Sequence, residues 1–160
     1  MATDLFAKIG DIKGESRDEK HKEEIDVLSW SWGVSQNAAV AQGSGAGSGK
    51  ASFNDFTFAH LVDKASPGLM KACATGEHLK EATISARKAG KGQQDYLIIR
   101  MKEVIVTSVM PSGTREDPST LETVSMRFAK VDLEYKTQKP DGSLDAGTHF
   151  KFDVKANKEG

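Results

Sequence analysis

The sequence predicts a mainly β protein whose strands form a strongly curved sheet or a barrel, with one short helix. Residues 25–35 alternate apolar and polar side chains with a period of two, which is typical of a strand with two different faces. This segment and residues 124–135 both switch the phase of the alternation midway, as strands do at bulges in curved sheets. Only residues 66–76 carry the signals that begin and end a helix.

Composition indicates an ordinary soluble domain. The chain has 160 residues, 38% of them hydrophobic and 28% charged, so we expect one domain spanning residues 1–160. The net charge of −1 gives no excess of Lys and Arg to attract phosphate backbones or anionic lipid. The apolar runs are too short for membrane insertion, and residues 1–9 lack the pattern of a secretory signal. We therefore expect a protein that starts in the cytoplasm and binds neither nucleic acid nor membrane.

The strand at residues 25–35 is the most informative element. Leu28, Trp30, Trp32 and Val34 share one face, and Ser29, Ser31 and Gly33 share the other. We expect both tryptophans to lie in the core or at a subunit interface. Before this strand, residues 5–9 read as a short strand and residues 15–24, almost wholly polar, as a solvated surface loop.

Further strands are expected after this one, at residues 51–58, 78–87, 96–109 and 149–154. The third of these is apolar on both faces in places, which indicates burial on both sides. Pro140, Asp141 and Gly142 provide a turn before the last strand.

The helix signals are local and specific. Ser66 is the expected N-cap, Pro67 suits the first helical position, and Gly76 can end the helix. One apolar face would carry Leu69, Met70 and Cys73. A helix of two or three turns is not stable alone, so it must pack on the sheet, and Cys73, the only cysteine, is expected to be a packing residue.

No motif indicates catalysis, a cofactor or a metal. Residues 43–50 resemble a phosphate-binding loop, but Ser44 stands where the motif needs its first glycine and Ala51 where it needs Ser or Thr. The four histidines do not form a metal-ligand pair on one helix, and the single cysteine has no partner. The basic residues of 87–92 read as a solvated turn. We therefore expect a protein that is not an enzyme.

An ordered set of segments resembles the Hcp family, the haemolysin-coregulated tube proteins of type VI secretion. The segments are Gly14-Glu15-Ser16 with His21, residues 25–33, the Gly-rich loop, residues 63–67 with Leu69, residues 87–90, residues 96–99 and residues 128–131. They cover essentially the whole chain in order.

The resemblance implies a fold and a function. The fold would be an antiparallel β-barrel made of two sheets, with one short α-helix on its flank. Copies would form hexameric rings that stack into a tube inside a contractile sheath, with a VgrG-type spike at the tip. The protein would be cytoplasmic when assembled and then secreted without a cleaved signal peptide, and effector proteins would travel in its lumen.

Two sets of residues are candidates for these roles. Ser29 and Ser31, small and polar, would face the channel and contact cargo. The long loop at about 36–50 would contact a neighbouring subunit; the alternative is a disordered loop that touches nothing. Its candidate residues are Gln36, Gln42, Gly43, Ser44, Gly45, Gly47, Gly49 and Lys50.

A second function class remains open from the residues alone. In a ligand-binding barrel that works as a monomer, Trp30 and Trp32 would line an apolar pocket. The mass of the protein in solution separates the two interpretations, because the tube subunit forms a closed ring.

Overall fold

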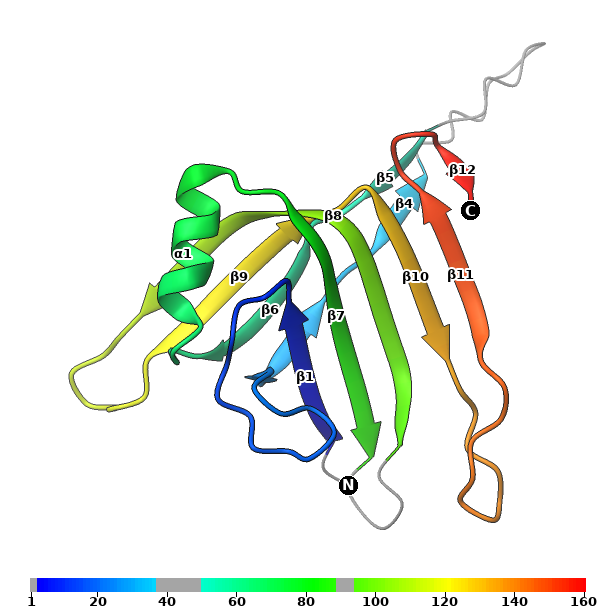
Figure 1. The fold of residues 1–160 in the computed structure, drawn as a ribbon, viewed down its shortest axis with the longest axis horizontal. Coiled ribbons are helices and arrows are strands. Elements are labelled where there is room, and N and C mark those ends of the chain that lie inside the picture. Colours follow the sequence, from blue (N-terminus) through cyan, green and yellow to red (C-terminus); the bar gives the residue numbers. More distant parts are fainter. Residues whose placement is uncertain (1–2, 37–49, 89–93) are drawn as a thin grey trace.

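A computed structural model describes residues 3–36, 50–88 and 94–160. Over these residues the chain forms antiparallel β-strands and one short α-helix, as Figure 1 shows. The strands are β1 (Thr3–Ile9), β2 (Ile25–Val27), β3 (Ser29–Ser31), β4 (Val34–Gln36), β5 (Ala51–Phe53), β6 (Phe56–Leu61), β7 (Leu79–Lys88), β8 (Asp95–Ser112), β9 (Leu121–Arg127), β10 (Lys130–Tyr135), β11 (Thr148–Asp153) and β12 (Lys158–Glu159). The class predicted from the sequence, mainly β with one helix, is confirmed.

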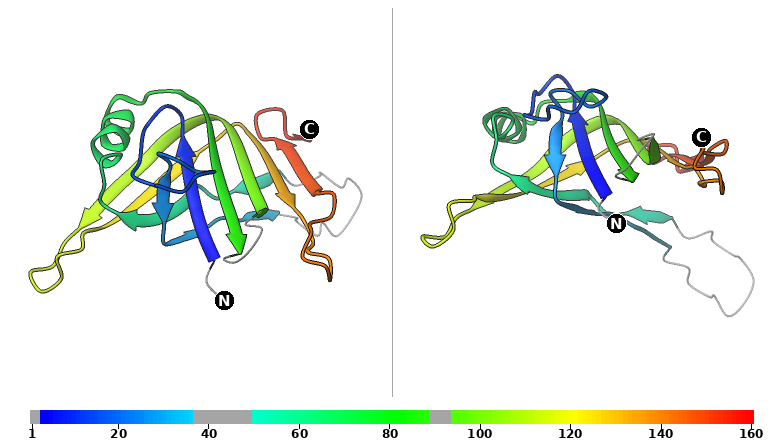
Figure 2. Two further views of the ribbon diagram at one scale, coloured as in Figure 1. Left: turned by 60° about the horizontal axis from the view of Figure 1, so that its bottom comes forward. Right: turned by 90° about the horizontal axis from the view of Figure 1, so that it is seen from below.

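The strands form two arms that share the long strand β8. The first arm has the order β12-β11-β10-β8-β7-β1-β2, and the second has the order β3-β6-β9-β8. Strand β10 pairs with the first part of β8, through Val131 opposite Met101, and β9 pairs with the second part, through Val124 opposite Val109. The sheet bends where the two arms meet (Figures 1 and 2).

The bend in β8 has local causes in the backbone. Glu103 has a positive φ of 53°, which is unusual for a residue with a side chain. The register of β8 against β9 also shifts between Val106 and Ser108. On the partner side, Phe128 and Ala129 interrupt the pairing and separate β9 from β10. The phase switch predicted within residues 124–135 is therefore the point where the chain passes from one arm to the other.

Residues 25–35 form three short strands instead of one long strand. Val27 of β2 pairs with Leu5 of β1, whereas Ser31 of β3 pairs with Thr57 of β6. The segment 25–31 thus links the outer edges of both arms, while β4 and β5 form a separate two-stranded ribbon. The pairing defines one bent ten-stranded sheet and this ribbon, where the family resemblance implied a barrel of two sheets.

The breaks between these strands change which side chains are buried. Leu28 is 57% exposed and Val34 is 52% exposed, so they do not share a buried face with the tryptophans as expected. Leu28 lies between β2 and β3, and Val34 opens the ribbon that leaves the sheet (Figure 2). The expected face shared by Leu28, Trp30, Trp32 and Val34 was therefore wrong at its two ends, because residues 28–34 pass from one packing environment to another.

The helix α1 (Ser66–Thr75) begins and ends close to the predicted residues. Ala65, not Ser66, is the N-cap, and the Ser66 hydroxyl accepts a hydrogen bond from the Asp63 N–H at 3.1 Å. Gly76 ends the helix in the left-handed conformation, as predicted. The buried helix residues are Ser66, Leu69 and Ala72, while Met70 is exposed. At ten residues, α1 falls short of the length needed to cross a membrane, and no other helix occurs in the described ranges.

The core lies between the bent arms. Its largest fully buried apolar side chains are Phe56, Phe58, Ile9, Ile25, Leu69, Ile84, Ile99, Met101, Met126 and Val104. The two faces of β8 differ in burial. Ile99 and Val106, on one face, are in the core, whereas Ile98 and Ile105, on the other, are partly exposed. The sequence predicted burial on both sides of this strand, but only one side is fully buried.

Candidate functional site

The outer face of the second arm carries a row of hydroxyl side chains across four strands. Ser31 of β3 lies opposite Thr57 of β6, Thr57 opposite Ser125 of β9, and Ser125 opposite Ser108 of β8. The Thr57 and Ser125 hydroxyl oxygens are 3.0 Å apart and share a hydrogen bond. We call Ser31, Thr57, Ser125 and Ser108 the hydroxyl row.

Two further rows complete this outer face. The row beside the hydroxyl row consists of Ser29, Ala59, Thr123 and Met110. The row after it, at the end of the strands, consists of Leu61, Leu121 and Ser112. The face is thus built from small polar side chains at one end and from exposed apolar ones at the other.

The opposite face of the same strands belongs to the core. Trp30 lies opposite Phe58, and Val124 lies between Phe58 and Val109 across the strands. Ser29 and Ser31 are therefore exposed on the face away from the core, as the alternation in the sequence predicted. Thr57, Thr123 and Ser125 were not singled out, although the alternation of residues 121–127 is a signal that could have found the last two.

The two tryptophans pack against aromatic rings. Trp30 stacks on Phe56 with ring centroids 5.6 Å apart, and Trp32 stacks on Phe53 at 6.1 Å and meets Phe128 edge-on at 5.8 Å. Both are half-buried and packed against the core. This packing supports a structural role for the indoles.

A buried ionic cluster holds residues 15–24 against the sheet. Arg87 is only 3% exposed, and its guanidinium donates two hydrogen bonds to the carboxylate of Asp18 and one to Asp4 at 3.3 Å. The guanidinium also lies 5.0 Å from the centre of the Phe6 ring. The hydrogen bonds from Arg87 hold the pKa of Asp18 below its ordinary value. The expectation that Arg87 belongs to a solvated turn was therefore wrong.

His21 completes this cluster. Its ring stacks on Phe6 with centroids 4.3 Å apart, and its two nitrogens each lie 3.0 Å from a carboxylate oxygen, of Glu24 and of Asp95. Burial raises the pKa of Glu24, and the charge of His21 opposes that rise. The loop at 15–24 was expected to be solvated, but His21 and Ser16 are buried because these partners hold the loop onto β1 and β8.

A second buried pair lies between β6 and β9. His60 Nε2 is 2.8 Å from Glu122 Oε1, and both side chains are fully buried. His60 Nδ1 faces Asp63 at 3.7 Å. Burial raises the pKa of Asp63. Within the ranges that the structure describes, no group of three His, Cys, Asp or Glu side chains is placed to hold a metal ion.

Among the candidate residues of the long loop, Gln36 and Lys50 lie within the described residues. Gln36 ends β4, lies opposite Ala51 of β5 and is exposed; Lys50 is also exposed. Gln42, Gly43, Ser44, Gly45, Gly47 and Gly49 lie outside the described residues. Contact between this loop and a neighbouring subunit remains a prediction.

The fold and this surface define a class of small, mainly antiparallel β protein with one short helix and an exposed sheet face that carries a row of hydroxyl side chains. The family described as "Type VI secretion system effector, Hcp" has a model that matches residues 6–135. The chain therefore belongs to the Hcp family, a secreted family of type VI secretion systems, and the resemblance found in the sequence is confirmed.

Individual relatives agree with this assignment. The chain is 48% identical over 159 residues to protein hcp1 of Pseudomonas aeruginosa, covering 98% of each chain. The crystal structure of Hcp1 from Salmonella typhimurium is 39% identical with a TM-score of 0.78, covering 99% of each chain. A structure of a type six secretion system protein has a TM-score of 0.92 at 26% identity, covering 99% of this chain and 100% of that one. The Hcp family is not known as an enzyme family.

Proposed function

We propose that this chain is a tube subunit of a type VI secretion system, and that copies of it form hexameric rings that stack into a tube. The observation that carries the proposal is the outer face of the second arm. Its hydroxyl row and the neighbouring Ser29, Ala59 and Thr123 form a surface of small side chains, beside which Met110 is 66% exposed. Such a surface suits the wall of a wet channel.

The two arms support a barrel in each subunit. Residues 25–31 pair with β1 through β2 and with β6 through β3, and β8 belongs to both arms. The bent sheet would then enclose the core and leave the hydroxyl row outside it. A single domain with this shape offers one face to a channel and other faces to its neighbours.

The number of charged side chains distinguishes the face proposed for the channel from the face proposed for the outer wall. On the second arm, the charged side chain Arg127 is paired with Asp55 at 3.2 Å. The outer face of the first arm carries more charged side chains: Lys102 lies opposite Lys130, and Arg100 lies opposite Asp132, with which it forms an ion pair at 3.6 Å. We place the hydroxyl face toward the lumen, where effector proteins travel, and the charged face toward the contractile sheath.

Ser29 and Ser31 are the proposed contacts for cargo. A hydroxyl can hydrogen-bond a guest weakly without trapping it, and ring symmetry multiplies weak contacts. The residues near 36–50 are the proposed contacts between subunits. A VgrG-type spike would bind at the end of the tube, and the assembled protein would leave the cell when the sheath contracts.

Site-specific labelling tests which face lines the channel. In a Cys73→Ala background, Ser31→Cys would be coupled to a gold cluster and the particles imaged in negative stain; Lys151→Cys on β11 is the matched control. We expect density inside the ring for position 31 and on its outer rim for position 151. Gold at position 31 on the outer rim would contradict the proposed orientation.

A further inference from the structure

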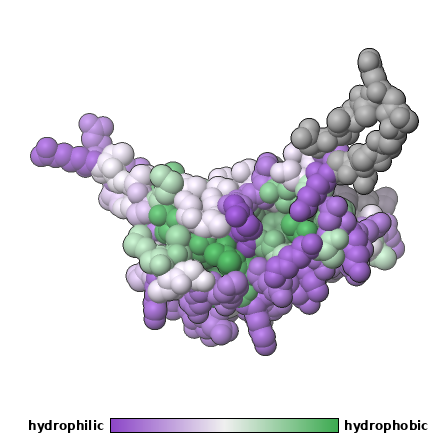
Figure 3. Space-filling model, turned by 90° about the horizontal axis from the view of Figure 1, so that it is seen from above, coloured by the Kyte–Doolittle hydropathy of each residue, from purple (hydrophilic) through white to green (hydrophobic). Residues whose placement is uncertain are grey.

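The loop between β8 and β9, residues 113–120, projects far from the body of the protein. Figures 1 and 3 show it at the left of the molecule, as a polar extension of the sheet. Residues 113–119 are all exposed. Its charged side chains are Arg115, Glu116 and Asp117, so acidic groups outnumber basic ones.

Hydrogen bonds within this loop and a buried contact at its base restrict its conformation. Asp117 accepts a hydrogen bond from the Ser119 N–H at 2.8 Å, and its own N–H donates to the Thr114 hydroxyl at 3.2 Å. At its base, Glu122 is fixed by the buried contact with His60. A loop that is already ordered loses little conformational entropy when it binds a partner.

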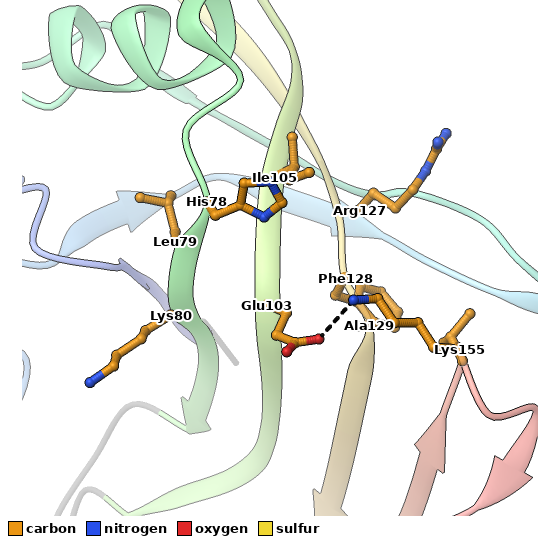
Figure 4. A pocket seen from close by; sticks show the side chains of 10 residues that line it. His78, Leu79, Lys80, Glu103, Ile105, Arg127, Phe128, Ala129 and Lys155 are labelled. Atoms are coloured by element: carbon orange, nitrogen blue, oxygen red, sulfur yellow. Dashed lines mark ion pairs between the residues drawn. The ribbon is translucent and has the colours of Figure 1, made fainter.

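A hollow of about 500 Å³ lies elsewhere on the molecule, beside the bend in β8 (Figure 4). Its apolar floor includes Leu79, Phe128 and Ala129, and its volume lies in the range of ordinary binding pockets. Its basic side chains are Lys80, Arg127 and Lys155, against the single acidic Glu103, which pairs with Lys155 at 3.3 Å. Lys80 is exposed and forms no ion pair with the residues that the structure describes.

We propose that the β8–β9 loop of one copy docks into this hollow on the next copy; the inference rests on the proposed ring and names the contact that closes it. The acidic loop complements the basic rim, and Pro118 gives the loop an apolar group for the apolar floor. Because loop and hollow are different surfaces of one chain, the contact is head-to-tail, which is the kind of contact that generates rings. Charge complementarity also selects this pairing over others.

Reversing the charge of each surface by substitution tests the contact. The loop variant is Glu116→Lys, and the hollow variant is Lys80→Glu with Lys155→Glu; each reverses the net charge of its surface. Asp117 is kept because it orders the loop. We expect each variant alone to lower the apparent association constant about tenfold or more, measured by light scattering across a dilution series.

Combining the substitutions should restore assembly. The triple variant, and an equal mixture of the loop and hollow variants, should both form rings, since every acidic surface again meets a basic one. Glu19→Lys with Lys71→Glu, exposed residues outside the loop and the hollow, is the matched control and should assemble like the wild type.

The outcomes separate this contact from the proposed function. If the wild type forms rings and the loop and hollow variants assemble equally well, the contact is wrong and the tube function stands. Failure of the triple variant to recover, with an unchanged circular dichroism spectrum, also overturns the contact. A monomeric wild type contradicts the ring itself and the contact with it.

Discussion

Replacing Arg87 with methionine removes the centre of the buried ionic cluster while keeping a similar apolar stem. The guanidinium donates to both Asp18 oxygens and to Asp4, and it lies over Phe6. Breaking a buried charge pair by removing one partner costs about 3–5 kcal/mol. Here the carboxylates can regain part of their hydration, because the Asp18 and Asp4 side chains are 19% and 39% exposed. We therefore expect Arg87→Met to lower the free energy of unfolding by about 3 kcal/mol.

Urea denaturation at pH 7 measures this change, under conditions in which all variants have the same oligomeric state. In a chain of this length the same loss corresponds to a fall in Tm of about 6–12 °C. Lys88→Met is the matched control, because Lys88 is the exposed neighbour of Arg87 and its contacts are with Tyr96 and Gln138 at the surface. A loss for Arg87→Met no larger than that of the control would refute the reasoning.

The effect of Arg87→Met depends on pH with a defined sign. Arg87 depresses the pKa of Asp18 in the folded protein. A carboxyl group with a depressed pKa stabilises the fold above its unfolded-state pKa, and this contribution disappears as the pH falls through the folded-state pKa. The difference in unfolding free energy between wild type and Arg87→Met should therefore be full at neutral pH and shrink in acid, below the ordinary range of an aspartate. A difference that grows in acid would contradict this assignment.

Three further changes test other parts of the proposal. Trp30→Ala removes an indole that stacks on Phe56 at 5.6 Å, and should reduce soluble yield and lower the free energy of unfolding, measured by urea denaturation, by about 3 kcal/mol or more; an unchanged thermal midpoint would contradict its packing role. Shortening the segment between Gln36 and Lys50 should leave the subunit folded by circular dichroism but shift rings toward monomers; an intact ring at low micromolar concentration would show that the segment is not a subunit contact. Ser31→Gln should preserve folding and ring assembly but reduce retention of effector proteins in co-purification, with Ser35→Gln on the ribbon as the control. Loss of the ring in Ser31→Gln would instead place Ser31 at a subunit contact.

The elements that the sequence predicted well are those with local signals. The alternation of Trp30 and Trp32 with the neighbouring serines correctly put Ser29 and Ser31 on the exposed face, and Gly76 ended the helix as expected. The short strand β12 was missed because Lys158 and Glu159 carry no apolar pattern. Exposure of Leu28 and Val34 was also missed, since alternation does not show where a strand changes partners.

The features that the sequence could not predict depend on contacts between distant residues. Arg87 belongs to a run of basic residues that is typical of a solvated turn, and only the fold brings Asp18 and Asp4 to it. The hydroxyl row needs the register of four strands, so Ser31 could be placed on a face but not beside Thr57 and Ser125. Sequence patterns therefore identified one strand of the proposed channel surface, and the strand pairing identified the rest.

The mass of the purified protein in solution tests the central claim most directly. Light scattering coupled to size-exclusion chromatography, with negative-stain imaging of the same fraction, measures both the mass and the shape of the particle. Six copies of the 17.3 kDa chain give a ring of about 104 kDa with a central channel, which is the result that the proposed tube subunit predicts. A single species of 17.3 kDa at tens of micromolar, without rings in the images, would contradict it.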